Sequence, residues 1–146
     1  MQYNIVLSAD RILEQVYAFC ALDHIINKGK RPAVLGRDNR KALVQLIKNL
    51  AAKLVYALGD RVKYTSLIDS PESDEIEVRL EIATAEAVMD VRPLLEAALA
   101  DDVMATAYAG VDSCVSGTYD ELYLANLEQV KARIRALDLP GRIEAA

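Results

Sequence analysis

The stretch that decides the fold is EIEVRLEI, residues 75–82, in which charged and apolar residues alternate strictly. Successive side chains of a strand point to opposite faces, so the four apolar residues share one face. This period of two is typical of a half-buried strand. A helix over 72–90, which Ser70-Pro71-Glu72 could start, would instead spread the apolar residues around its circumference. The stretch therefore predicts a strand.

A second, weaker alternating run precedes this strand and includes Val62, Tyr64 and Ile68. The two runs are separated by the acidic turn DSPESD, residues 69–74. Two alternating runs joined by a turn are the pattern of a β-hairpin. We therefore expect one hairpin at about residues 62–82.

The residues before the hairpin predict an extended arm followed by two helices. Residues 2–7 alternate weakly, and Ser8 is a suitable N-cap for a helix over 9–27. The second helix is expected to begin at Asp38 as its cap and to end before Gly59. Its apolar residues recur at spacings of three and four, and the linker is short, so we expect the two helices to form an antiparallel pair.

The residues after the hairpin predict two further helices. Pro93 is expected in the first turn of a helix over 93–109, while 84–91 fits either a helical turn or a loop. Residues 111–117 are expected to form a loop. Thr118 and Glu121 have the spacing of a capping box and predict a helix from 118 to about 137. Pro140 and Gly141 then stop it, and we expect an extended tail.

The predicted fold class is mainly α: a single domain, residues 1–146, with a four-helix body, one β-hairpin insertion and extended termini. Of the 146 residues, 53% are hydrophobic, which argues against disorder. Charges interrupt every apolar stretch, so no membrane span is expected. The N-terminus lacks the features of a secretory signal. Cys20 and Cys114 fit no spacing motif, so we expect two free thiols.

The residue types that carry chemistry are few. His24 lies four residues after Cys20, but zinc sites need three or four ligands and nothing else has ligand spacing, so we expect a core histidine. Asp101 and Asp102, with Glu96 nearby, are not expected to form a carboxylate dyad, because adjacent helical residues point about 100° apart. We expect them on a solvated helix face. There is no glycine-rich phosphate loop. We therefore expect no catalytic residue, no cofactor, no metal site and no enzyme.

The net charge of −5 is unevenly distributed. Residues 1–61 hold ten Lys and Arg against five Asp and Glu, whereas 62–146 hold seven against seventeen. Two short segments, 28–41 and 69–77, carry most of this contrast. They are either solvated surface segments or complementary patches that meet between neighbouring copies of the chain, and the second reading makes them candidates for protein contacts. The candidate interaction residues are Lys28, Lys30, Arg31, Arg37, Arg40 and Lys41 in the basic segment, and Asp69, Glu72, Asp74, Glu75 and Glu77 in the acidic one. No specific nucleic-acid binding is expected, because the basic segment has no aromatic residue for stacking.

The order of these parts resembles the small head–tail connector (adaptor, or head-completion) proteins of tailed bacteriophages. The resemblance spans nearly the whole chain and contains no signature motif. The parts that carry it are the long helix Asp38–Leu58, the hairpin Val62–Ile82, the core helix Pro93–Gly110, and the terminal helix Thr118–Leu137 with its tail Pro140-Gly141-Arg142-Ile143.

This resemblance implies a non-catalytic virion protein that forms a ring of copies in the neck, docked between portal and tail proteins and assembled in the host cytoplasm. The terminal residues 2–7 and 140–146 would then be ordered only in the assembly. The alternative is a cytoplasmic bacterial adaptor or regulator that binds a protein partner through the same hairpin.

Overall fold

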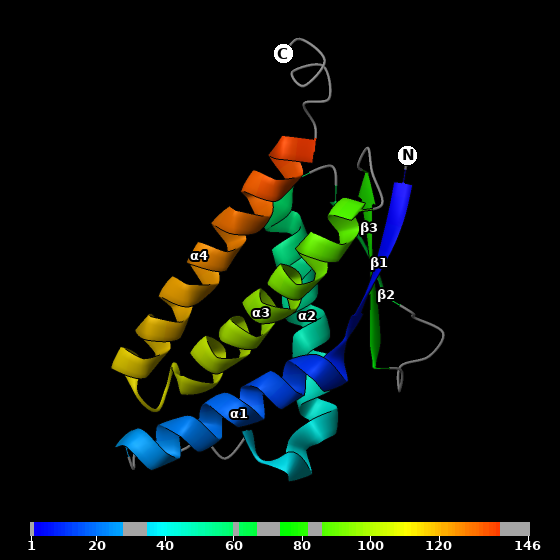
Figure 1. The fold of residues 1–146 in the computed structure, drawn as a ribbon. Helices are drawn as coiled ribbons and strands as arrows, with labels where there is room; N and C mark the ends of the chain where they lie inside the picture. Colours follow the sequence, from blue (N-terminus) through cyan, green and yellow to red (C-terminus); the bar gives the residue numbers. More distant parts are fainter. Residues whose placement is uncertain (1, 28–34, 60–61, 67–73, 82–85, 138–146) are drawn as a thin grey trace.

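The computed structural model describes residues 2–27, 35–59, 62–66, 74–81 and 86–137, which form four α-helices packed beside an antiparallel sheet (Figure 1). This arrangement confirms the mainly α class with a hairpin. In chain order the elements are β1 (Gln2–Ser8), α1 (Ala9–Asn27), the 3-10 turn η2 (Arg37–Asn39), α2 (Arg40–Leu58), β2 (Val62–Ser66), β3 (Glu75–Glu81), α3 (Glu86–Tyr108) and α4 (Ser113–Leu137).

The sheet has the order β1-β3-β2, so β3 is its central strand. β2 and β3 pair antiparallel with Tyr64 opposite Val78, which confirms the hairpin. β1 pairs with the other side of β3, with Ile5 opposite Val78. The N-terminal residues were expected to be ordered only in an assembly. That expectation is wrong for residues 2–7, because the single chain already gives β1 a partner strand.

The alternation of β3 gives the sheet one apolar face. Ile76, Val78 and Leu80 are fully buried, together with Ile5 and Leu7 of β1. This face packs against α2 and α3, and it joins the helices in one continuous core. Burial of five such side chains on one face fixes the register, because a slip by one residue would turn all of them outward.

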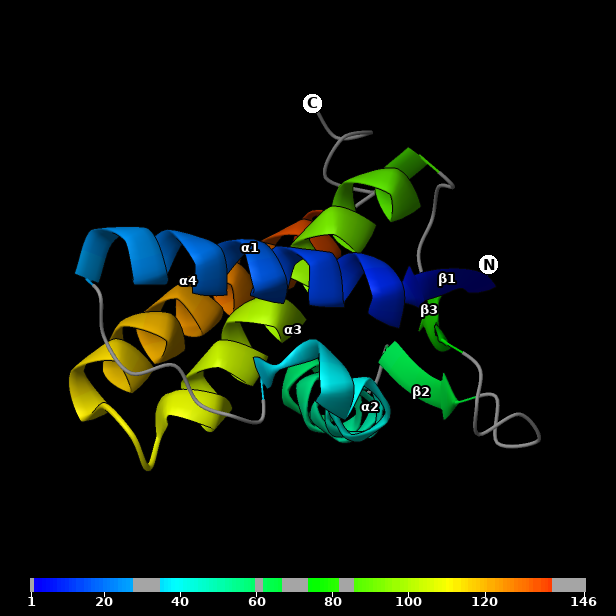
Figure 2. The same cartoon turned by 90° about the horizontal axis from the view of Figure 1, so that it is seen from below.

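The ends of the first two helices agree in part with the sequence. Ser8 caps α1, since its Oγ accepts the main-chain N–H of Arg11 at 3.2 Å. Gly59 ends α2 with φ +96°, a conformation that favours glycine. Asp38 does not cap α2, because it lies in η2 before the helix begins. The expected antiparallel pair is also wrong: α1 crosses α2 at a steep angle (Figure 2).

The third helix is longer than the sequence suggested. α3 begins at Glu86, seven residues before Pro93, so Pro93 lies inside the helix and not in its first turn. Proline in a helix interior costs one main-chain hydrogen bond and is disfavoured. The helix is retained here because the turn before Pro93 carries Val91, which is buried in the core. Residues 86–91 are therefore helical.

The fourth helix also begins earlier than predicted, at Ser113. Its cap is Asp112, whose Oδ1 accepts the N–H groups of Cys114 and Val115 at 3.1 and 3.2 Å. Thr118 lies inside α4 and donates its hydroxyl to the Cys114 carbonyl. The predicted capping box is therefore wrong, and so is the predicted loop over residues 113–117, because Asp112 caps the helix six residues before Thr118. α3 and α4 run side by side and antiparallel (Figure 1).

Some predictions lie outside the described residues: Ile68, the turn at 69–73, and the tail after 137. The side chain of His24 is also outside them. Both cysteines are free thiols, as expected; Cys20 is buried with its Sγ 3.9 Å from the Sδ of Met104, and Cys114 is exposed. None of the helices in the described ranges is long and apolar enough to cross a membrane.

The buried face of β3 gives the first test. Replacing Ile76 with Ala should lower the free energy of unfolding by about 2–5 kcal/mol, because the side chain is fully buried and leaves a cavity. Replacing Glu77, its outward neighbour, with Ala should change stability by about 0.5 kcal/mol or less. Urea unfolding followed by circular dichroism measures both. Equal losses for the two variants would contradict the assignment of faces.

Candidate functional site

Three carboxylates of α3 are removed from water. Asp102 is 2% exposed, Asp101 4% and Glu96 5%. The expectation that Asp101 and Asp102 lie on a solvated face is therefore wrong. A buried carboxylate is costly unless it is hydrogen-bonded or paired with a cation. Each of the three has such a partner, and each partner comes from a different element.

Glu96 binds the junction of β1 and α1. Its Oε2 accepts the main-chain N–H of Ser8 at 2.9 Å, and the guanidinium of Arg11 lies within 3.2 Å of both carboxylate oxygens. Because Ser8 is the cap of α1, the carboxylate also lies at the positive end of that helix. Glu96 therefore ties the first helix and the edge of the sheet to α3.

Asp102 faces α2 on the other side. The Nζ of Lys53 lies 2.9 Å from its Oδ2 and 5.0 Å from the centre of the Tyr123 ring of α4. Burial alone lowers the pKa of Lys53, but the bond to Asp102 and its charge outweigh that effect and raise it. Burial, and then the charge of Asp102, raise the pKa of Tyr123. The contact joins three helices through one ammonium group.

Asp101 faces α4 and has a neutral partner. The Nδ2 of Asn126 donates to its Oδ2 at 2.7 Å. Burial raises the pKa of Asp101 to about 6, and the hydrogen bond from Asn126 only partly opposes this. Asp101 is therefore a carboxyl group that changes its charge close to neutral pH.

These three sites do not converge on a common point, because they bind different elements. Within the described ranges no group of three or more His, Cys, Asp or Glu side chains is placed to hold a metal ion. The three acids form hydrogen bonds and ion pairs that hold α3 against α1, α2 and α4. We interpret this cluster as structural.

Two of the predicted interaction residues, one from each charged segment, meet within the same chain. The guanidinium of Arg40 lies 2.8 and 3.2 Å from the two carboxylate oxygens of Asp74 and 3.2 Å from Asp10. The hydrogen bond from Arg40 lowers the pKa of Asp74. The carbonyl of Asp74 also accepts the N–H of Ala9 at 2.8 Å. This joint connects the starts of α1, α2 and β3.

The remaining predicted interaction residues lie in several places. Arg37 is exposed, 4.3 Å above the ring of Tyr17 and 3.8 Å from Glu14. Lys41 is exposed on α2, and Glu75 and Glu77 point outward from β3. Five of the predicted set lie outside the described residues: Lys28, Lys30, Arg31, Asp69 and Glu72. Of the members that lie in the described ranges, Arg40 and Asp74 are brought together.

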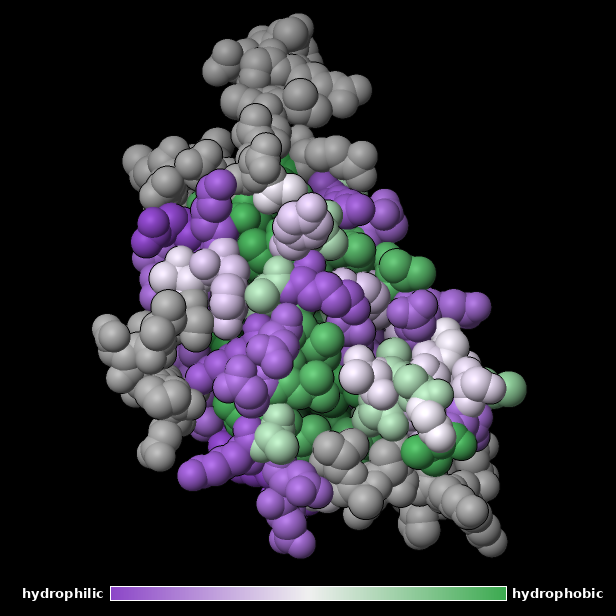
Figure 3. Space-filling model, turned by 180° about the vertical axis from the view of Figure 1, so that it is seen from behind, coloured by the Kyte–Doolittle hydropathy of each residue, from purple (hydrophilic) through white to green (hydrophobic). Residues whose placement is uncertain are grey.

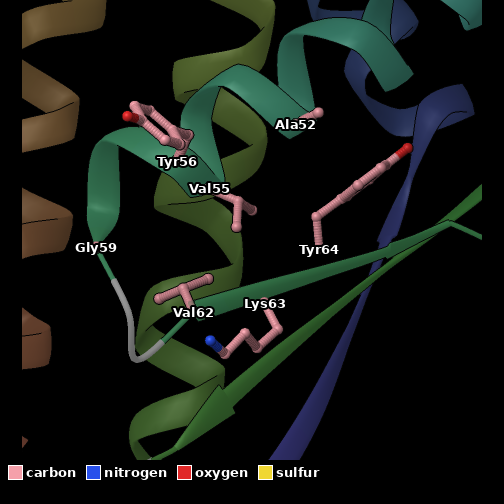
Figure 4. A pocket seen from close by; sticks show the side chains of 7 residues that line it. All are labelled: Ala52, Val55, Tyr56, Gly59, Val62, Lys63 and Tyr64. Carbon is pink, nitrogen blue, oxygen red and sulfur yellow. The ribbon is translucent and has the colours of Figure 1, made fainter.

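Sequence reasoning missed a groove between α2 and β2. It is a hollow of about 560 Å³ lined by Ala52, Val55, Tyr56 and Gly59 on one side and Val62, Lys63 and Tyr64 on the other. Figure 4 shows Val55 and Val62 pointing toward each other, with Tyr64 rising from β2. Tyr56 is 90% exposed. Its position off the apolar stripe of α2 was the only signal in the sequence.

The pair of Lys53 and Asp102 gives a second test. Replacing Lys53 with Met should lower the free energy of unfolding by about 2–3 kcal/mol, because a buried carboxylate loses its cation. Lys41→Met on the same helix is the matched control and should change stability by about 0.5 kcal/mol or less. Asp102→Asn together with Lys53→Met should cost less than Lys53→Met alone. A double variant that costs the sum of the single ones would contradict the pairing.

Asp101 gives a pH test. Its native pKa of about 6 lies above the unfolded value of about 4, so the folded chain holds more protons between these values. The buried charge of Asp101 therefore lowers the free energy of unfolding by its full amount above about pH 6, and the effect disappears below about pH 4. Asp101→Asn keeps an acceptor for Asn126 and should gain about 2–3 kcal/mol at pH 8 but little at pH 4. Urea unfolding at both pH values measures the difference, with exposed Asp120→Asn as the control. An equal gain at both pH values would contradict the burial of a charge.

The comparisons with known proteins add no relative. The chain matches no family model, no curated protein and no solved structure. The buried acids, the joint at Arg40 and the groove beside β2 are therefore the features from which a function can be inferred.

Proposed function

We propose that this chain is a non-catalytic assembly protein that works by docking, and that its place is the neck of a bacteriophage virion as a head–tail connector. The observation that carries the proposal is the asymmetry of the sheet. Each edge strand packs against a helix, β1 against α3 and β2 against α2, but β2 also lies beside an open groove. Exposed sheet edges are surfaces on which other chains pair.

Two further features support docking. The body is held by ties between elements, so its surface can meet a partner without refolding. Figure 3 shows hydrophobic surface in the middle of the face that carries α2, flanked by hydrophilic side chains. An apolar centre with a polar rim is the usual anatomy of a protein interface. Copies of the chain in a ring, with portal and tail proteins on either side, are the proposed partners.

The alternative is an adaptor or regulator that binds a single protein partner through the hairpin. The joint between Arg40, Asp74 and Asp10 favours it, because two of the charges expected to join neighbouring copies are already paired inside one chain. The remaining candidates for contacts between copies include Lys41, Glu72 and Glu77. The two functions differ in stoichiometry, which an experiment can measure.

The test is assembly with the portal protein encoded in the same genome. We expect light scattering and electron microscopy to detect a ring of this chain on the portal, weakened by salt as surface charge pairs are. Glu72→Lys with Glu77→Lys should impair the ring and spare the fold. Asp120→Lys with Glu121→Lys on α4 makes the same change in charge and should spare both. A genome with no portal gene, or a chain that stays monomeric beside its portal, would refute the connector and leave the adaptor.

A further inference from the structure

The two edges of the sheet differ in what faces them. At β1, the outward N–H of Ser8 is bonded to Glu96 of α3, at the end of the strand where α1 begins. At β2, the N–H of Val62 is bonded to the carbonyl of Gly59 at 3.3 Å and so points away from β3. Main-chain groups alternate sides along a strand, so those of Tyr64 also point away from β3. They face the groove.

The groove has the position of a fourth strand. It runs along β2, over the C-terminal half of α2, with Val55 and Val62 as its apolar floor (Figure 4). Tyr56 stands at its rim with almost its whole side chain in water. A large exposed aromatic beside a free strand edge is a suitable anchor for a partner, because it buries much area with little loss of freedom.

The charges on the outer face of the sheet indicate which charge a partner strand should carry. Lys63 of β2 lies directly opposite Arg79 of β3, and like charges in opposite positions are unfavourable. On the same face, Glu77 lies one row away, opposite Thr65. Among the described residues Lys63 has no ion pair within 4 Å. An acidic side chain on a strand beside β2 would lie next to Lys63.

We propose that the groove between α2 and β2 binds an extended segment of a partner protein, which adds to the sheet as its fourth strand. Its acidic side chains lie beside Lys63 and its apolar side chains face Val55 and Val62. This inference names the partner surface of the docking function proposed above and rests on it. Strand addition derives affinity from main-chain bonds and specificity from alternate side chains.

A second copy of the chain fits the groove less well. The edge strands that its described part offers are β1 and β2, and neither carries an acidic residue. β3 is already paired on both sides. The charge of Lys63 therefore favours a different, acidic chain.

The test uses two fluorescent peptides, one alternating valine with glutamate and the other valine with lysine. We expect the acidic peptide to bind the full chain at least about tenfold more tightly in an anisotropy titration up to about 1 mM. Lys63→Glu should reverse the preference, while Lys131→Glu, the same change on α4 and away from the groove, should leave the preference for the acidic peptide intact. Hydrogen exchange should show the Tyr64 amide protected by the acidic peptide.

The outcomes separate cleanly. Tyr64→Pro removes the N–H that faces the groove and should abolish binding of the peptide. If Tyr64→Pro does not fold, the reversed peptide preference of Lys63→Glu tests the same site. Equal binding of both peptides, no binding up to about 1 mM, or an unprotected Tyr64 amide would overturn the proposal. Dimerisation that Tyr64→Pro abolishes would also overturn it, since the occupant would be a second copy. If neither peptide binds but the chain still forms a ring on the portal, the binding site in this groove is refuted and the connector function is not.

Discussion

The structure depends on the need to satisfy three carboxylates buried on one helix. Glu96, Asp101 and Asp102 lie within two turns of α3, and each is bonded to a different neighbour: the start of α1, α4 and α2. Apolar packing alone would allow these elements to slide or turn with small loss, because it is not directional. A bonded buried acid does not allow this, since breaking its bond leaves an unsatisfied charge. The three acids thus specify how the body is assembled around α3.

Much of the fold follows from local patterns. The alternation at 75–82 predicted β3, and the apolar repeat of α2 with Gly59 predicted that helix and its end. Those features depend on neighbours in the chain. Pro93 suggested a helix start because proline is over-represented in the first turn, but α3 extends one turn and more before it, and Val91 in that turn is buried in the core. Thr118 misled because its spacing to Glu121 is that of a cap, while Asp112 supplies one earlier.

The buried acids and the groove could not be predicted from the sequence. Charged residues are usually exposed, and what reverses that rule for Asp102 is Lys53, 49 residues away. Asp101 depends on Asn126 in the same way. The groove can be recognised only when the positions of α2 and β2 relative to each other are known. The one sign of it in the sequence is Tyr56, which lies off the apolar stripe of α2. The uneven distribution of charge along the chain can be read from the sequence. The sequence does not show that Arg40 and Asp74, one from each charged segment, form an ion pair within one chain.

The pairing of β1 with β3 has a consequence for the order of folding. β1 and α1 are adjacent in sequence, but the strand's partner lies on the order of seventy residues further along the chain. During synthesis α1 and α2 can form early as local structures, whereas β1 has no partner until β3 has left the ribosome. The sheet therefore closes late, and in that interval the apolar face of β1 is exposed to other chains. A nascent chain of this protein is most prone to aggregate in that interval.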